Sequence, residues 1–137
     1  MSPCKKGWYR FSEIKNLDAS PKKISAINSG MIIPLRVFNS VKYRDNLFLD
    51  MVDHAFCDDV RDAGYSFYIM HDVVLMQNYS RETDNLDQSH RRFMISKKDN
   101  RTYYGSSLSS RVFCEIQIIY WKIKKAIKYR SISILAW

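Results

Sequence analysis

The chain has few of the residues that build small all-β, disulfide-rich or metal-binding domains. It contains four glycines and three prolines in 137 residues, and tight hairpins need more glycine than this. Its three cysteines are widely spaced without a CxxC pair, which favours neither a disulfide framework nor a zinc ribbon. No apolar run approaches the roughly 20 residues that cross a bilayer, and residues 1–11 do not resemble a signal peptide. We therefore expect a cytoplasmic protein of mixed helix and strand, with Cys57 and Cys114 reduced and in the core.

Negative charge is also scarce, and it is concentrated in the middle of the chain. Residues 1–41 hold seven Lys/Arg against two Asp/Glu, residues 42–72 three against seven, and residues 97–137 nine against two, within a net charge of +8. A nucleic-acid module usually spreads positive charge over the face that meets phosphate. Because the best candidate site is acidic, the pattern argues against nucleic acid as the main ligand.

The first half of the chain alternates short strand and helix signals. Residues 24–27 predict a strand that ends at the turn of residues 28–30, and Pro34 suits the first turn of a short helix. A stripe of apolar residues at helical spacing then predicts a helix that Gly64 ends: Leu49, Val52, Phe56, Val60 and Ala63. Residues 65–70 and 73–76 read as two strands around a turn at His71-Asp72.

The second half contains a polar stretch and a basic helix. The polar residues 77–101 predict a long loop. Beyond it, a second amphipathic stripe predicts a helix: Val112, Ile116, Ile119, Ile123 and Ala126 or Ile127. Four lysines that could meet an anionic membrane or a partner protein cluster near its end: Lys122, Lys124, Lys125 and Lys128. The alternative is that this stripe packs on the domain and the lysines are only solvated.

Two carboxylates at the start of the helix that Gly64 ends suggest acid–base chemistry. Asp50 and Asp53 lie three residues apart, so Asp53 could take a proton from a hydroxyl while Asp50 orients the substrate. The alternative is an ordinary structural role, because acids in a first helical turn cap the helix and stabilise its dipole.

A family pattern favours the catalytic interpretation. Ser29-Gly30, the segment from Phe48 to Asp53 with Phe56-Cys57, and Gly64-Tyr65 follow one another in an order that resembles the acceptor-side half of family 2 glycosyltransferases, particularly the rhamnosyltransferase-like branch. The resemblance covers about residues 24–77. It implies an α/β fold, as a partial GT-A Rossmann-like domain with short strands and a C-terminal amphipathic helix.

The resemblance also implies an activity and its residues. The complete enzyme would transfer a sugar, such as rhamnose, from a nucleotide sugar to a polysaccharide or lipid-linked acceptor with inversion, using Mn²⁺ or Mg²⁺. Asp53 takes the position of the general base. Four further residues would bind the acceptor: Asp50, His54, Ser29 and Gly30.

This chain departs from the family pattern in ways that bear on the donor. Ala55 stands where the family has an acid, Asp59 where it has an arginine and Gln77 where it has a histidine, and His71 lies six residues before that position. No Asp-x-Asp motif occurs, and Glu82-Thr83-Asp84 reads as solvated loop. We expect a partner chain that carries the donor half, or self-association, and peripheral contact with the inner face of a membrane.

The sequence thus predicts three regions and one alternative function. Residues 1–23 are unassigned, residues 24–110 form the acceptor-side part, and residues 111–137 form the basic helix and tail.

No metal site is expected, because His54 and Cys57, with His71 or His90, are more typical of packed or titrating side chains than of ligands. The alternative function is a small basic module that docks on membrane, protein or nucleic acid.

Overall fold

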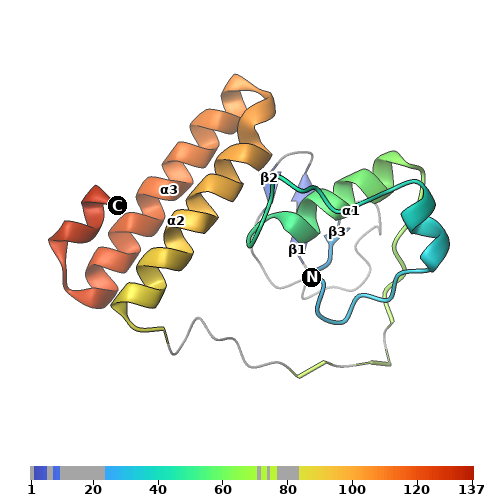
Figure 1. Ribbon diagram of the computed structural model, residues 1–137, viewed down its shortest axis with the longest axis horizontal. Helices are drawn as coiled ribbons and strands as arrows, with labels where there is room; N and C mark the ends of the chain where they lie inside the picture. Colours follow the sequence, from blue (N-terminus) through green and yellow to red (C-terminus); the bar gives the residue numbers. More distant parts are fainter. Residues whose placement is uncertain (1, 6–7, 10–23, 71, 74, 77–83) are drawn as a thin grey trace. The chain divides into compact units, whose positions relative to one another are not determined.

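A computed structural model of the chain describes residues 2–5, 8–9, 24–70, 72–73, 75–76 and 84–137 (Figure 1). These residues divide into two compact units. Unit 1 takes its residues from Met1–Asp45 and Met51–Gln77, and unit 2 takes its residues from Asn46–Asp50 and Asn78–Trp137. Each unit has its own buried side chains, so each is described by itself.

Unit 1 combines three short strands with two helices. Strands β1 (Ser2–Lys5), β2 (Trp8–Tyr9) and β3 (Ile24–Ser25) lie in the order β2-β1-β3, with both pairings antiparallel. They are followed by the 3₁₀ helix η2 (Leu35–Asn39) and the α-helix α1 (Val52–Asp62). The strand expected near residue 24 and the helix expected after Pro34 are therefore present, each as a short element.

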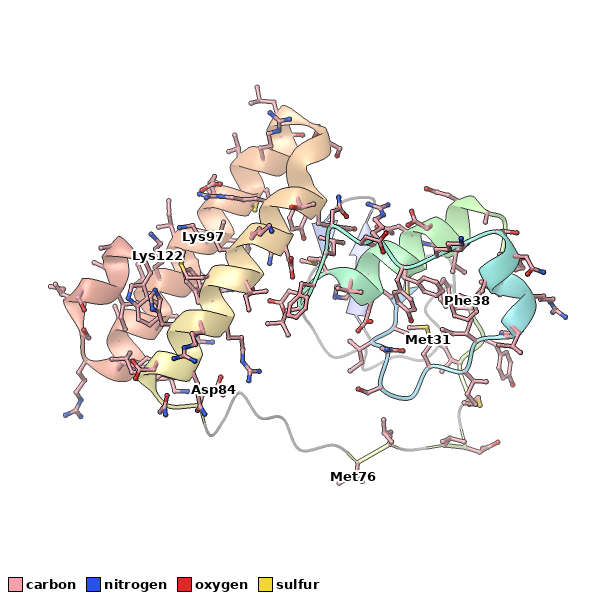
Figure 2. The ribbon with its side chains drawn as sticks, in the orientation of Figure 1. Met31, Phe38, Met76, Asp84, Lys97 and Lys122 are labelled. Carbon is pink, nitrogen blue, oxygen red and sulfur yellow. The ribbon has the colours of Figure 1, made fainter. Side chains whose placement is uncertain are left out.

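The core of unit 1 forms where η2 and the following loop meet α1. Val37 and Val41 pack with Phe56 and Val60, and partly buried neighbours that include Met31 and Phe38 surround them (Figure 2). The ring of Tyr43 stacks on that of Phe56, with centroids 4.3 Å apart. Of the predicted stripe, this cluster contains Phe56 and Val60, whereas Leu49 precedes α1 and, like Ala63, is exposed.

The predicted end of α1 is also confirmed. Gly64 has φ +86°, a left-handed conformation that glycine adopts without strain. The N–H of Tyr65 donates to the carbonyl of Val60 at 3.1 Å, and that of Gly64 donates to Arg61 at 2.9 Å. These two bonds satisfy carbonyls that the last turn leaves unpaired, as in a Schellman motif.

Unit 2 is a helical hairpin. Helix α2 (Leu86–Tyr103) leads through the 3₁₀ turn η4 (Tyr104–Ser106) to α3 (Leu108–Tyr129), and the short 3₁₀ helix η5 (Ile132–Ala136) folds back on α3 (Figure 1). The connection between α2 and α3 is short, which makes the two helices antiparallel neighbours. Four apolar side chains from these elements are almost fully buried: Phe93, Cys114, Ile118 and Ile134.

A buried carboxylate ties a loop segment to the hairpin. Asp99 of α2 is 1% exposed. Its Oδ1 accepts from the N–H of Phe48 at 3.2 Å, and its Oδ2 accepts from those of Leu49 and Asp50 at 2.6 and 2.9 Å. Three successive backbone donors thus surround one anion, which explains why residues 46–50 belong to unit 2.

The predicted α/β fold is wrong. The described residues are mostly helical, and their strands are two to four residues long and pair only antiparallel. A Rossmann-like domain needs a sheet of parallel strands with helices on its faces. Residues 65–70, which were expected to form a strand, pair with no neighbouring strand in the described structure. A partial GT-A domain is therefore not the architecture of the described residues.

The predicted loop over residues 77–101 is wrong as well, because most of it is α2. Asn85 accepts from the backbone N–H of Gln88 at 2.9 Å, and the Gln88 side chain accepts from the N–H of Asn85 at 3.1 Å. This reciprocal capping box starts a helix. The stretch looked like loop because the side of α2 that packs on its neighbours is itself largely polar, with five of its side chains buried: Ser89, Phe93, Ser96, Asp99 and Asn100.

Candidate functional site

The predicted base, Asp53, lies beside the predicted turn. Asp53 is the second residue of α1 and is partly exposed, and its Oδ2 accepts from the N–H of Asn28 at 2.9 Å. Twenty-five residues separate these two in the chain. The described residues give Asp53 Oδ1 no hydrogen-bond partner. That oxygen is therefore able to accept a proton from a bound hydroxyl.

The turn that Asp53 contacts lies at the surface of the unit. Asn28, Ser29 and Gly30 are exposed, and the N–H of Met31 closes the turn on the carbonyl of Asn28 at 3.1 Å. Gly30 has φ +87°, and a Cβ there would stand 3.0 Å from Cδ2 of Leu75. Both facts favour glycine at this position.

Tyr43 is a member of the cluster that the sequence did not indicate. Its hydroxyl donates to Oδ1 of Asn28 at 3.4 Å. Burial, and then the negative charge of Asp53, raise the pKa of Tyr43. The phenol therefore stays protonated and can donate a hydrogen bond. Its ring stacking on Phe56 fixes its place, and that contact is too long-range to be read from the chain.

His54, predicted to bind the acceptor, points into the core instead. It is 6% exposed, and its Nδ1 lies 2.6 Å from Oγ of Ser25, itself 1% exposed. Cys57 is fully buried beside them, its Sγ donating to the carbonyl of Ala26 at 3.6 Å. Burial raises the pKa of the Cys57 thiol. These three groups join β3 to α1 and carry no accessible nucleophile.

The structure does not bring Asp50 into the cluster. Asp50 belongs to unit 2, where its carboxylate accepts a hydrogen bond from Ser96 and its N–H donates to Asp99. The chain turns between Asp50 and α1 at Met51, a buried residue with φ +62°. The two carboxylates are close in sequence, but their side chains are engaged in different units.

The positions where the chain departs from the family pattern have structural roles. Ala55 is fully buried, and Asp59 forms a two-bond pair with Arg44 at 2.6 and 2.8 Å. Asp84 pairs with Arg92 at 3.1 Å. Four residues of interest lie outside the described residues: His71, Gln77, Glu82 and Thr83.

The described residues do not fit a divalent cation. Among them, no three His, Cys, Asp or Glu side chains gather in a way that could hold a metal ion. Mg²⁺ and Mn²⁺ prefer several oxygen ligands, and Asp53 is the one carboxylate in the cluster with Asn28 and Tyr43.

Of the four lysines expected at a membrane or partner surface, two are engaged within unit 2. Nζ of Lys125 donates to Oγ of Ser89 at 2.6 Å, and Nζ of Lys122 donates to the carbonyl of Leu135 at 3.1 Å. Lys122 is labelled in Figure 2 together with Lys97, whose pKa is lowered by burial and then by the charges of Lys122 and Arg101. The side chains of Lys124 and Lys128 are exposed.

Comparison with known proteins identifies no relative of the chain. No family model, curated protein or solved structure matches the chain. Of the helices in the described ranges, none combines the length and apolar character needed to cross a membrane.

Proposed function

We propose that this chain supplies the acceptor-binding side of an inverting glycosyltransferase, with Asp53 as the general base. The observation that carries the proposal is the hydrogen bond between the Asn28 N–H and Asp53. It unites the turn of residues 28–30 with the start of α1, the two motifs on which the resemblance rests. The proposal depends on these residues and their contacts, and not on the architecture that the resemblance implied.

The chemistry requires one proton acceptor and one oriented hydroxyl. As the acceptor oxygen bonds to the anomeric carbon, its proton passes to Oδ1 of Asp53, and the sugar–phosphate bond breaks with its electron pair leaving on the nucleoside diphosphate. The N–H of Asn28 holds Oδ2 and so fixes the plane of the carboxylate. The exposed side-chain amide of Asn28 can hydrogen-bond a further hydroxyl of an acceptor sugar.

The donor has to be bound elsewhere. The chain has no Asp-x-Asp motif, and the described residues offer no cluster of metal ligands. A nucleotide sugar would therefore be held by a partner chain. On this proposal the isolated chain binds saccharide without turning over a donor.

The test is saccharide binding by the purified chain on an array of oligosaccharides. We expect selective binding that Asp53→Asn weakens about tenfold or more, because a charge-assisted hydrogen bond to a hydroxyl is lost. Asp62→Asn is the matched control: it makes the same change at an exposed residue, at the other end of α1. Circular dichroism checks that both variants fold.

Two results would contradict the proposal. One is a folded chain that binds no saccharide on the array, and the other is equal binding by the wild type and Asp53→Asn. Titration with UDP- and dTDP-sugars in Mn²⁺ adds a further check, because specific binding would place a donor site on this chain. The small basic binding module stays a prediction for the chain as a whole.

A further inference from the structure

Helix α3 exposes an apolar stripe along its whole length. Leu108 and Ile127, at its two ends, are 79% and 73% exposed. The exposed apolar residues from Leu108 to Ile127 follow one another at intervals of four, four, three, four and four residues. These intervals keep all of them on one face of a helix. We call this set the outer stripe: Leu108, Val112, Ile116, Ile119, Ile123 and Ile127, with Tyr120 at its edge.

The outer stripe is not the surface that holds unit 2 together. The buried residues of α3 are Ser110, Cys114 and Ile118, which fall on the opposite side of the helix. Lys125 lies on that side as well, bonded to Ser89 of α2. Five large aliphatic side chains in the outer stripe are more than half exposed within the described structure. A continuous apolar patch of this kind marks an interaction surface.

The segment that carries the outer stripe is strongly basic. Residues 84–137 hold eleven Lys/Arg against four Asp/Glu. By helical spacing, Lys122 borders one edge of the stripe and Lys124 the other, and Lys128 lies one turn beyond Lys124. Aliphatic residues between flanking lysines suit a surface that is apolar in its interior and anionic at its rim. A second copy of this basic unit would bring like charges together.

We propose that the outer stripe of α3 docks on an anionic phospholipid surface. The 22-residue helix is about 33 Å long at 1.5 Å per residue. It would lie along the surface with its aliphatic side chains among the acyl chains and its lysines at the headgroups. Tyr120, 56% exposed at the edge of the stripe, suits the interface between the two.

The first experiment measures co-sedimentation of the whole chain with vesicles of phosphatidylcholine that contain 30% phosphatidylglycerol. We expect Ile116→Asp with Ile123→Asp to reduce the partition coefficient at least tenfold. Met94→Asp is the control, because Met94 is an aliphatic residue of α2 with 44% exposure, close to the 47% of Ile123. Equal binding by the stripe variant and the wild type overturns the proposal.

The second experiment separates this face from total charge. Lys124→Gln with Lys128→Gln and Arg91→Gln with Lys98→Gln remove the same charge from exposed positions of α3 and α2 respectively. Only the α3 pair should weaken vesicle binding several-fold, and circular dichroism checks folding. If both pairs weaken binding equally, the basic charge alone binds lipid and the stripe does not dock.

A third measurement tests whether a second copy of the chain occupies the stripe instead. Without vesicles, the wild type and the variant Ile116→Asp with Ile123→Asp should sediment with the same state of association. If only the wild type associates and vesicles do not compete with this association, the stripe is an interface between copies. The outcome is independent of saccharide binding, because no residue of the outer stripe belongs to the Asp53 cluster.

Discussion

Asp99 is the residue on which the arrangement of unit 2 depends most directly. Its carboxylate accepts three backbone N–H groups from residues 48–50 while almost fully buried. Nothing in the local sequence distinguishes it from the other aspartates, since its partners lie about fifty residues earlier. The burial of Cys57 and Cys114, in contrast, followed from residue type and spacing and is confirmed.

Asp99→Asn should lower the free energy of unfolding by about 2–3 kcal/mol, measured by urea denaturation. The amide keeps the shape of the side chain, but it accepts fewer hydrogen bonds and turns an NH₂ toward backbone donors. Asp87→Asn is the control on the same helix, where the residue is exposed in the first turn. It should cost less than about 1 kcal/mol, the usual size of a dipole interaction. Equal losses would mean that the buried carboxylate of Asp99 contributes no more to the free energy of unfolding than an exposed acid does.

At the scale of elements, apolar periodicity located α1 and α3 but not α2. Helix α1 buries Phe56 and Val60 of the predicted stripe, but Leu49 lies before the helix and Ala63 is exposed. The other buried residues of α1 are His54, Ala55 and Cys57. Helix α3 has the predicted period, yet it exposes that stripe and packs through other residues. The pattern fixes which residues share a face, and the neighbouring elements decide which face is covered.

The capping box of α2 gives a prediction for the helix that the sequence pattern missed. Asn85→Ala should destabilise the protein by about 1 kcal/mol, because the N–H of Gln88 loses its side-chain acceptor. Asn85→Asp is the matched variant that keeps an acceptor and adds a favourable charge at the helix N-terminus. The midpoint of urea unfolding should fall for the first variant alone. An unchanged midpoint in Asn85→Ala would show that the cap does not hold the start of α2.

At the scale of the molecule, the two units differ in charge as well as in fold. The acidic stretch of residues 42–72 lies mainly in unit 1, which also holds the Asp53 cluster, whereas residues 84–137 of unit 2 are strongly basic. Saccharide binding is accordingly proposed for unit 1 and lipid binding for unit 2. Each can fail without the other.

Salt should weaken binding to phosphatidylglycerol vesicles without abolishing it. Raising NaCl from 0.1 to 1 M shortens the Debye length from about 10 to about 3 Å, so the attraction of the lysines is screened while the apolar contact persists. We expect a several-fold lower partition coefficient at 1 M, measured by co-sedimentation. A complete loss at 1 M would mean that charge alone holds the chain to lipid.

The sequence by itself determined the local features of this protein. These features are the positions of α1 and α3, the left-handed end of α1 at Gly64 and the burial of two cysteines. They depend on residue type and on spacings of a few residues, which can be read directly from the sequence. The motifs that pointed to Asp53 and to the turn of residues 28–30 are local patterns of the same kind.

Only the tertiary structure decided how those parts are combined. It replaced the expected parallel sheet with helices, joined Asp53 and Tyr43 to Asn28, turned His54 inward and drew Asp50 into unit 2. Each of these outcomes depends on groups that are 15 to about 50 residues apart. Contacts at that separation are chosen by burial and hydrogen-bond satisfaction over a whole unit, and no local pattern encodes them.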